Sequence, residues 1–402
     1  MNPGLIDTLV TDSDRKIVFL IMDGIGGLPH PETGLTELES AATPNLDALA
    51  REGVCGLLDP VGYGVTPGSG PAHFALFGYD PEAHTVGRGL LAAAGIDFPM
   101  KEGDLFARIN FATVDDNNMV IDRRAGRIDS ETNRRLCEKL SDTVKLAGNI
   151  SVSFETVREH RALLVLRGET FHEDIEDTDP GTTGKQPLPP RPLSPEAGET
   201  AAVIEDIIGQ AQRVLADEQR ANMILLRGFA RYRAYRTMRE RYRLNALAIA
   251  NYPMYRGIAR LLGMTVHSGT DSIPDEFTAL GTSFEQYDFF FLHVKQTDSR
   301  GEDGNFAGKV QVIEEVDALI PSVTALNPDV LVVTGDHSTP AALSSHSWHP
   351  VPVLIHGATV RTDGVTRFGE RDCIAGGIGR MPMVHLMGLA LAHAGRLKRF
   401  GA

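Results

Sequence analysis

The chain has no apolar run of the ~18 residues that a membrane-spanning helix requires, and it has few cysteines. Cys55, Cys137 and Cys373 are widely spaced and odd in number, which is typical of buried thiols in a reducing cytoplasm. The formal net charge of -14 disfavours general binding to nucleic acids or to anionic membranes. We therefore expect a soluble, cytoplasmic, globular protein.

Two nucleotide-binding motifs are also missing. After Gly24 and Gly26, the third position of a G-x-G-x-x-G fingerprint is Pro29, so a dinucleotide site is not indicated. The segment from Gly181 to Lys185 lacks the spacing and the Ser or Thr of a phosphate-binding P-loop. The chemistry of the chain must therefore depend on other residues.

What is present is an alternation of apolar strands and helices along 402 residues. Lys16–Met22 is a continuous apolar run, as expected of a strand covered on both faces. Helical patterns separate the strands, notably Thr200–Gln219, Phe306–Ile320 and a helix that Thr43-Pro44 opens and Gly53 closes. Such alternation predicts an α/β protein with a mainly parallel sheet. The other expected strands are Ala162–Leu166, Met223–Leu226, Ala246–Ala250, Phe289–Val294, Leu331–Thr334 and Val351–Ile355.

The middle of the chain has a different composition. It is rich in arginine, and it contains the proline segment Pro187–Pro195, which must be a loop. Residues suited to metal binding lie before and after this region. We therefore expect a discontinuous core domain, residues 1–90 and 244–402, with an α+β domain of residues 91–243 inserted into it.

The segment Asp329–His356 carries the strongest chemical signal. Its apolar strand ends in Gly335-Asp336-His337, just where an open α/β sheet builds a ligand site. Aspartate and histidine suit a divalent metal such as manganese or zinc. Three further histidines follow, namely His346, His349 and His356.

Two more carboxylates follow expected strands. Asp23 comes directly after the first strand, and Asp298 follows Phe289–Val294. A helical turn could place Glu302 on the same side as Asp298. Each residue has an ordinary alternative, because Asp23 could be a turn residue before glycines and Asp298 part of a solvated acidic turn.

Ser69 lies between Gly68 and Gly70 and leads into an expected helix from Ala72. A glycine-flanked serine before a helix can approach a phosphoryl group closely, with backbone N–H donors aimed at the anion. The ordinary alternative is a helix N-cap. Beside the three carboxylate sites, however, Ser69 completes a set suited to phosphoryl transfer at two metals about 4 Å apart.

Arginines gather in the middle region. Forked guanidinium groups suit carboxylates and phosphates, so we expect about a third of these residues to hold a small, doubly anionic substrate and many of the others to be solvated. The cluster comprises Arg123, Arg124, Arg127, Arg161, Arg167, Arg227 and the run Arg231–Arg243.

Longer stretches of the sequence carry a resemblance that covers nearly the whole chain. They are MDGIGG (22–27), ESAATPNLDALAREGVCGLLDP (39–60), TPGSGPAHFALFGYDP (66–81), GRG (87–89), FATV (111–114), DRRAGRI (122–128), EHRALLVLRG (159–168), DTDP (177–180), ILLRGFA (224–230), YRGIARLLGM (255–264), YDFFFLHVK (287–295) and VVTGDHSTP (332–340). In these stretches the chain resembles the cofactor-independent (2,3-bisphosphoglycerate-independent) phosphoglycerate mutases of archaeal type, in the alkaline phosphatase superfamily.

The resemblance implies a phosphatase-like core that binds two divalent metals and interconverts 3-phosphoglycerate and 2-phosphoglycerate through a phosphoserine at Ser69. It implies one metal held by Asp23, Ser69, Asp336 and His337. It implies a second metal held by Asp298, His346 and a third ligand. Finally, it implies arginines that grip phosphoglycerate: Arg123, Arg124, Arg127, Arg161, Arg227 and Arg256.

The chain also departs from its relatives. They usually read D-G-x-G-D, whereas Gly27 replaces the last acid here, and Gly70 stands where they usually have Asp after the serine. They usually supply the third ligand of the second metal as a histidine, where this chain has Glu302. Our hypothesis is that Glu302 ligates directly or that His349 supplies the missing imidazole. A carboxylate there favours Mn²⁺ or Mg²⁺ over Zn²⁺, with Zn²⁺ and Co²⁺ as the other candidates.

Two other functions are open to a chain with these residues. A metal-dependent phosphatase or phosphotransferase, acting on another small phosphorylated hydroxy acid, would use the same core. A metal-binding protein without catalysis would account for Gly27 and Glu302. The arginine-rich insertion favours the mutase, because a plain phosphatase has less reason to hold the dephosphorylated acceptor.

Overall fold

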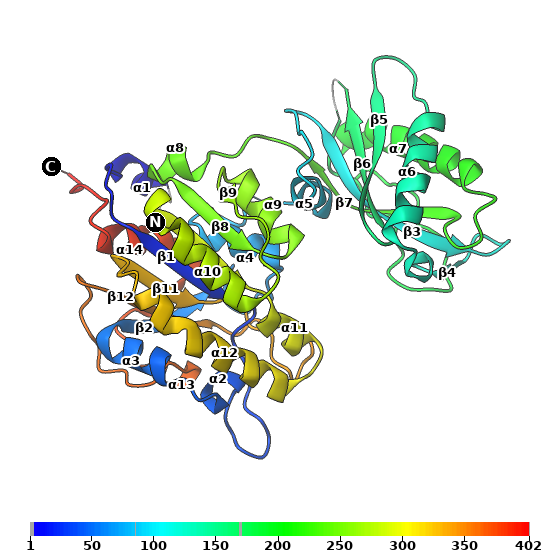
Figure 1. Ribbon diagram of the computed structural model, residues 1–402. Helices are drawn as coiled ribbons and strands as arrows, with labels where there is room; N and C mark the ends of the chain where they lie inside the picture. The colour runs from blue at the N-terminus through cyan, green and yellow to red at the C-terminus, as the bar shows by residue number, and fades with distance from the viewer. Residues whose placement is uncertain (1–3, 85, 169–170, 402) are drawn as a thin grey trace. The chain divides into compact units, whose positions relative to one another are not determined.

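The computed structural model describes residues 4–84, 86–168 and 171–401, which form two compact units (Figure 1). The first unit comprises Met1–Thr85 with Arg236–Ala402, and the second comprises Val86–Tyr235. The chain thus leaves the first unit, builds the second and returns. The limits at 85 and 235 lie five and eight residues before the expected 90 and 243.

The first unit is built on an eight-stranded sheet in the order β13-β2-β12-β11-β1-β10-β8-β9. Strand β1 is central and runs parallel to both β10 and β11, and all of its residues are buried. Only β12 runs against its neighbours β11 and β2, so the predicted α/β class with a mainly parallel sheet is confirmed. The strands are β1 Ile17–Met22, β2 Val54–Asp59, β8 Ala246–Ala250, β9 Thr265–Val266, β10 Phe289–Val294, β11 Val330–Thr334, β12 Val351–Gly357 and β13 Gly379–Pro382.

Helices cover both faces of this sheet, which explains why its central strands are apolar throughout. Helices α10, α12 and α3 lie on the viewer's side in Figure 1, and α4 and α14 lie behind the sheet. The helices of this unit are α1 Gly4–Leu9, α2 Glu37–Ser40, α3 Pro44–Glu52, α4 Ser69–Leu76, α8 Met238–Tyr242, α9 Pro253–Leu261, α10 Ile273–Ser283, η3 Phe284–Gln286, α11 Gln296–Glu302, α12 Phe306–Thr324, α13 Glu370–Cys373, η4 Met383–His385 and α14 Leu386–His393.

The register of the central strands decides where the site forms. Met22, the last residue of β1, lies opposite Val294, the last residue of β10. Ile21 lies opposite Thr334, the last residue of β11. Because the three strands are parallel and end at the same level, the residues that follow them emerge together at one edge of the sheet.

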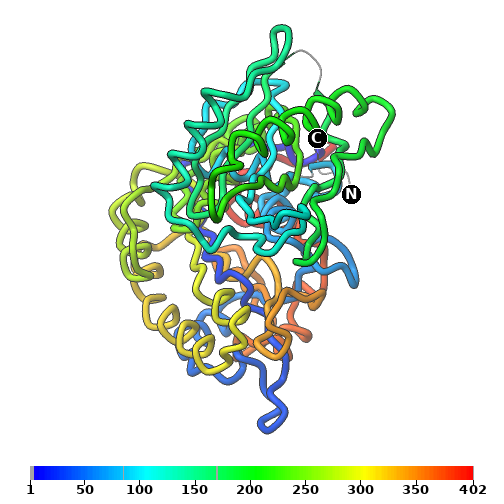
Figure 2. The backbone as a smooth tube through the Cα atoms, turned by 90° about the vertical axis from the view of Figure 1, so that its right-hand side faces the viewer, coloured from blue at the N-terminus to red at the C-terminus, as the bar shows by residue number. Residues whose placement is uncertain are grey.

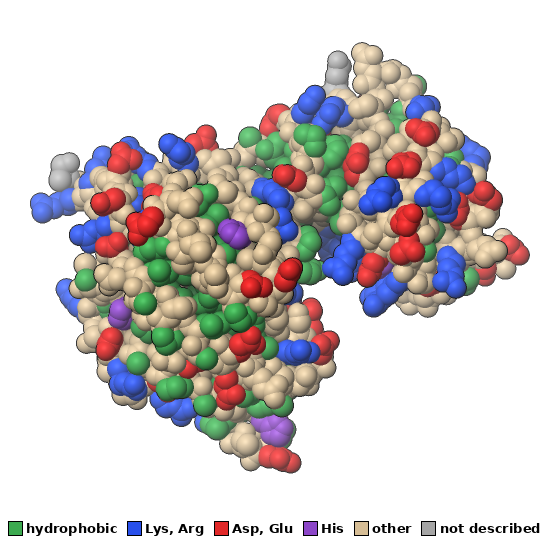
Figure 3. Space-filling model, in the orientation of Figure 1, with side chains coloured by type: hydrophobic (Ala, Val, Ile, Leu, Met, Phe, Trp, Pro, Cys, Tyr) green, Lys and Arg blue, Asp and Glu red, His purple; other side chains and the backbone are tan. Residues whose placement is uncertain are grey.

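The second unit is an α+β fold around a five-stranded antiparallel sheet. Its longest strand, β3, pairs with β4, β6 and β7, and alternate residues of β3 face a core beneath α6 and α7. Basic and acidic side chains are interspersed on the face that Figure 3 presents. The elements are α5 Arg88–Gly95, β3 Leu105–Val114, β4 Val120–Asp122, η1 Ala125–Arg127, α6 Ser130–Thr143, β5 Ser151–Arg158, β6 Arg161–Arg167, η2 Pro195–Ala197, α7 Gly198–Val214 and β7 Met223–Arg231.

The segments just inside the two ends of the chain lie side by side in the first unit (Figure 2). Val10 forms a β-bridge with Leu397, and the Lys398 amide donates to the Leu9 carbonyl at 2.9 Å. Across the described ranges, every helix is too short or too polar to cross a membrane.

Candidate functional site

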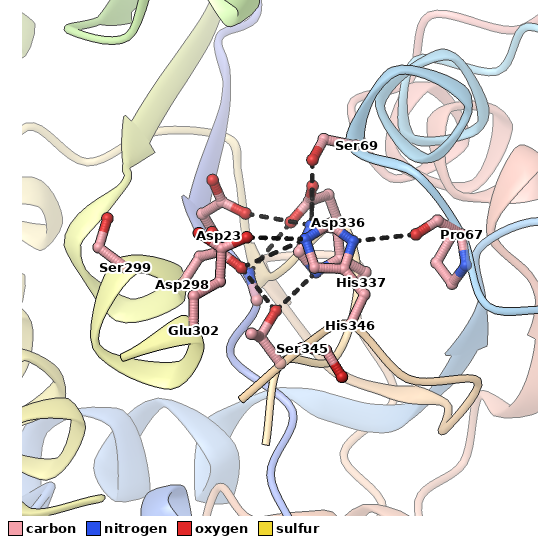
Figure 4. A network of polar contacts seen from close by, with 12 residues as sticks. Asp23, Pro67, Ser69, Asp298, Ser299, Glu302, Asp336, His337, Ser345 and His346 are labelled. Carbon is pink, nitrogen blue, oxygen red and sulfur yellow. Dashed lines mark hydrogen bonds and ion pairs between the residues drawn. The ribbon is translucent and has the colours of Figure 1, made fainter. Parts of the chain in front are cut away.

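The predicted carboxylates meet at the carboxyl ends of the central strands (Figure 4). Asp23 follows β1 and Asp336 follows β11, while Asp298 lies in the short helix α11 after β10. All three are fully buried. The interpretation of Asp298 as part of a solvated turn is therefore wrong, because its carboxylate is turned inward beneath the edge of the sheet.

Asp23, Asp336 and His337 form the first group of closely spaced ligand atoms. The Nε2 atom of His337 lies 3.4 Å from Oδ1 of Asp23 and 3.1 Å from Oδ2 of Asp336. Ligands at ~2.1 Å from one ion stand about 3 Å or slightly more from each other, so these separations suit a single divalent cation.

Asp298 and His346 define a second group, which also touches His337. Oδ1 of Asp298 lies 3.6 Å from Nε2 of His346, and Oε1 of Glu302 lies 3.8 Å from the same nitrogen. The imidazole rings of His337 and His346 stack with their centroids 3.7 Å apart. The two groups are therefore adjacent, and Glu302 stands at the exposed side of the second.

Hydrogen bonds fix the tautomers of both histidines. The hydroxyl of Thr339 donates to Oδ1 of Asp298 at 2.6 Å, so it must accept from Nδ1 of His337, which lies 3.0 Å away. Nδ1 of His346 lies 3.0 Å from the carbonyl of Pro67, which can only accept. Each ring thus carries its proton on Nδ1 and turns the lone pair of Nε2 toward carboxylate oxygens.

A lone pair that faces carboxylates at these distances is repelled unless a proton or a metal cation lies between them. Oδ1 of Asp23 and Oδ2 of Asp336 are buried and accept no hydrogen bond from any described residue. Burial, reinforced by Asp336, raises the pKa of Asp23 to about 7, and burial lowers the pKa of His337 to about 3. These residues fit a bound divalent metal, which would satisfy the orphaned oxygens and the lone pairs together.

Ser69 lies directly above the first group. Its Oγ is 3.3 Å from Nε2 of His337, and Figure 4 shows it pointing at the histidine. Helix α4 begins at Ser69 and its N-cap is Gly68, so the interpretation of Ser69 as an N-cap is wrong, as is the expected helix start at Ala72. Nδ1 of His73, one turn later, hydrogen-bonds the Ser69 carbonyl at 2.8 Å and thereby fixes the first turn.

His349 and His356 lie apart from both groups among the described residues. Nδ1 of His349 lies 3.0 Å from the hydroxyl of Ser347, and its ring stacks on Trp348. His356 lies in β12, where its Nε2 is 3.6 Å from Glu52 on the surface. Of the four histidines in the segment Asp329–His356, only His337 and His346 therefore face the carboxylates.

Sequence reasoning gave no role to several residues around the site. Lys295 follows β10 directly and places its ammonium 3.1 Å from Oδ2 of Asp23. Tyr255, in α9, donates its phenol proton to the same oxygen at 2.5 Å. Lys309, in α12, is fully buried and donates to backbone carbonyls of the Asp23 and His337 loops. Only Lys295 had a sequence signal, its position one residue past a predicted strand.

The arginines of the second unit form a cluster of their own around two aspartates. Arg123 makes a two-pronged ion pair with Asp179, at 2.8 and 2.9 Å. Arg227 lies 3.5 Å from both Asp177 and Asp179. Burial lowers the pKa of Arg88. The charges of the nearby Arg227 and Arg161 lower it further.

Other predicted arginines differ in their surroundings. Arg124 and Arg127 are exposed at η1. Burial lowers the pKa of His160, and the charges of Arg161 and Arg124 lower it further. Arg256 belongs to the first unit, in α9 directly after Tyr255, and its Nε is buried without a partner among the described residues. Arg88, which opens α5, was not among the predicted binding residues.

Comparisons with known proteins point to one family. A family profile described as "2,3-bisphosphoglycerate-independent phosphoglycerate mutase" matches residues 50–221. A "Probable 2,3-bisphosphoglycerate-independent phosphoglycerate mutase" of Thermus thermophilus is 47% identical over 401 residues, 99% of each chain. The solved structure of a Pyrococcus horikoshii protein superposes with a TM-score of 0.82 at 29% identity, covering 96% of this chain and 99% of the other. The cofactor-independent phosphoglycerate mutase of Thermoplasma acidophilum superposes with a TM-score of 0.71 at 28% identity, covering 94% and 99%.

Proposed function

The chain belongs to the 2,3-bisphosphoglycerate-independent phosphoglycerate mutase family, and from that premise we propose that it interconverts 3-phosphoglycerate and 2-phosphoglycerate through a phosphoserine at Ser69. The observation that carries this proposal is the position of Ser69 Oγ, 3.3 Å from the His337 nitrogen at the centre of the metal-type groups. This reaction would serve glycolysis and gluconeogenesis.

Two divalent ions fit the groups described above. Asp23, Asp336, His337 and Ser69 would hold one, and Asp298, His346 and Glu302 the other. When bound, such ions polarise phosphoryl oxygens and lower the pKa of an alcohol beside them. Glu302 is the better candidate for the third ligand of the second ion, because its Oε1 faces Nε2 of His346, whereas His349 is turned to Ser347 and Trp348. That carboxylate favours Mn²⁺ or Mg²⁺.

The transfer needs two displacements at the same serine. Ser69 Oγ attacks the phosphorus of 3-phosphoglycerate, the bond from phosphorus to O3 breaks, and the serine proton ends on O3. Glycerate stays bound and turns, so that its O2 attacks the phosphoserine. The bond from Ser69 Oγ to phosphorus then breaks, and the proton of the O2 hydroxyl returns to the serine. The net result is 2-phosphoglycerate and an unchanged enzyme.

Retention of glycerate distinguishes a mutase from a phosphatase. We assign that task to the arginines, whose forked donors suit the carboxylate and phosphate of a phosphoglycerate. Arg161 is supported most directly, because it lies near Arg88 and Arg227, whereas Arg227 is also paired with Asp177 and Asp179 at 3.5 Å. Arg123 is already engaged by Asp179 and is better placed to hold that loop in position.

The three cysteines support the proposal that the enzyme functions in a reducing compartment. Cys55, Cys137 and Cys373 are buried and free, which suits the expected cytoplasmic enzyme with a small-molecule substrate.

A direct assay tests the proposed function. Purified protein with Mn²⁺ and 3-phosphoglycerate should form 2-phosphoglycerate, and mass spectrometry after rapid quenching should find phosphate on the peptide that contains Ser69. The Ser69→Ala variant should lose both signals, while Ser345→Ala, a control at an exposed serine near the site, should keep them. Release of free phosphate without 2-phosphoglycerate would support the phosphatase instead. Turnover by Ser69→Ala would exclude the phosphoserine route.

A further inference from the structure

Lys295 stands between the two metal-type groups. Its ammonium lies 3.1 Å from Oδ2 of Asp23, a ligand of the first group, and it donates a hydrogen bond to Oδ2 of Asp298, a ligand of the second. The Tyr255 phenol oxygen lies 3.3 Å from the same ammonium. One side chain therefore touches both groups at once.

The two oxygens of Asp23 face different partners. Oδ2 accepts from Tyr255 at 2.5 Å, contacts Lys295 and lies 3.5 Å from Nε2 of His293. Oδ1 accepts no hydrogen bond in the described part of the chain and lies 3.4 Å from Nε2 of His337, which carries a lone pair. The donors gather on one oxygen, and the other is left without a donor among the described residues.

Asp298 repeats this division. Its Oδ2 accepts a hydrogen bond from Lys295. Its Oδ1 lies 3.6 Å from Nε2 of His346 and accepts a hydrogen bond from the Thr339 hydroxyl. In both aspartates the oxygen that faces a histidine lone pair is thus Oδ1, and the oxygen that faces Lys295 is Oδ2.

We propose that Lys295 is a positioning residue shared by both metal sites. Its ammonium, helped by the Tyr255 phenol on the Asp23 side, holds Oδ2 of each aspartate, so that each offers a single oxygen to its ion. The inference rests on the proposed function, because it assumes that divalent ions bind these groups. Hydrogen-bonded partners of this kind orient ligands, and their loss weakens metal binding by about 10- to 100-fold.

The two residues make different predictions for the two sites. Lys295→Met removes a partner of both aspartates, so the affinity of each site for Mn²⁺ should fall by about 10-fold or more. Tyr255→Phe keeps the ring and removes the phenol that donates to Asp23 and accepts from Lys295, while the hydrogen bond from Lys295 to Asp298 stays. It should weaken the first site and leave the second unchanged. A general loss of folding would instead affect both sites in both variants.

Variants that retain only one of the two metal sites allow the Mn²⁺ affinity of each site to be measured separately. His346→Ala removes a ligand of the second site only, and Asp336→Ala a ligand of the first only; the hydrogen bonds and ion pairs of Lys295 in the described structure are to Tyr255, Asp23 and Asp298 instead. Mn²⁺ is titrated into the metal-free protein in each background, with the free ion followed by electron paramagnetic resonance. Lys16→Met is the matched control, because Lys16 is bound to backbone carbonyls at the other end of β1 and its loss should not change either Kd.

Three results would overturn the proposal. They are unchanged Mn²⁺ affinity in Lys295→Met, tighter binding in that variant, which would make Lys295 a repelling charge, and equal weakening of both sites by Tyr255→Phe. Failure of the wild-type protein to bind two Mn²⁺ ions would count against the proposed function itself. The two failures are therefore distinguishable without an activity assay.

Discussion

Glu37 occupies the space that a side chain at Gly27 would need. A β-carbon built on Gly27 would lie 1.8 Å from Oε2 of Glu37. Glu37 is fully buried, and its other oxygen accepts from the Ala341 amide at 2.7 Å. The acid that relatives usually carry at the end of D-G-x-G-D is thus absent from position 27 of this chain, while a carboxylate from Glu37 lies against the same glycine.

We predict that Gly27→Asp destabilises the protein because it forces two carboxylates into one buried space. The free energy of unfolding should fall by about 3 kcal/mol, from overpacking and from like charge. Adding Glu37→Ala should recover a large part of that loss, since the new aspartate would then have room. Urea unfolding of the two single variants and the double variant measures the coupling.

The control for this series is Gly281→Asp in α10, where a β-carbon would meet no described atom within 4 Å. Its stability should stay within about 0.5 kcal/mol of the wild type. If the double variant lost as much stability as the two single variants together, the side chains at positions 27 and 37 would not compete for one space.

Lys309→Met should weaken the connection between the two loops that carry the ligands of the first group. The Lys309 ammonium donates to the carbonyls of Gly24, Gly26 and Thr339 at 2.8, 3.1 and 2.9 Å. Methionine would remove three hydrogen bonds, at about 1 kcal/mol or more each, although the carbonyls of Gly24 and Gly26 also accept from the Thr339 amide. We expect a loss of about 3 kcal/mol in urea unfolding, against no change for Lys398→Met at an exposed position. A loss below about 0.5 kcal/mol would mean that water replaces the ammonium.

Glu276 should make the protein less stable as the pH rises. Burial raises its pKa to about 8, and neither carboxylate oxygen has a hydrogen-bond partner in the described structure. The unfolded chain loses this proton near pH ~4.3, so from there to about pH 8 the folded state holds more protons and the free energy of unfolding falls.

Glu276→Gln should remove this dependence. The variant should match the wild type near pH 4.5 and exceed it increasingly toward pH 8, with about 4 kcal/mol as an upper bound. Urea unfolding at a series of pH values measures the difference, and Glu285→Gln, at an exposed position nearby, is the control. A constant difference at all pH values would indicate a packing effect instead of titration.

Glu302 and His349 should differ in their effect on metal content. Glu302→Ala should weaken the second ion, whereas His349→Ala should not, since His349 faces Ser347 and Trp348. Glu302→His should shift preference toward Zn²⁺, because imidazole is the softer ligand. Metal content after dialysis against limiting Mn²⁺ and Zn²⁺ checks all three. Full occupancy of both sites in Glu302→Ala would exclude Glu302 as a ligand.

The sequence was most informative where parallel strands end. Asp23 and Asp336 each follow an apolar run, and such runs mark buried strands whose carboxyl ends meet at one edge. The expected strands Ala246–Ala250 and Phe289–Val294 agree with β8 and β10. The antiparallel strands β3 and β5 were not predicted, because neither has a continuous apolar run: β3 is mostly buried but is interrupted by Arg108 and Asn110, and in β5 only Phe154 is buried.

The residues that were missed act through distant contacts. Lys309 lies 285 positions after Gly24, its acceptor, and a lysine in a helix is usually exposed. Tyr255 reaches Asp23 across 232 positions, and nothing in its local pattern marks the contact. Glu37 faces Gly27 only because the loop between them folds back. Sequence spacing reports local geometry, so such partners become visible only in the folded chain.

The central position of β1 also determines when the site can form. Its ladder partners are residues 289–294 and 330–334, so this six-residue apolar strand has no neighbour in the sheet until most of the chain has left the ribosome. Non-local pairing of this kind is slow, and an unpaired apolar strand invites association with other chains. The geometry that brings Asp23 beside Asp336 therefore leaves the nascent protein exposed to aggregation for most of its synthesis.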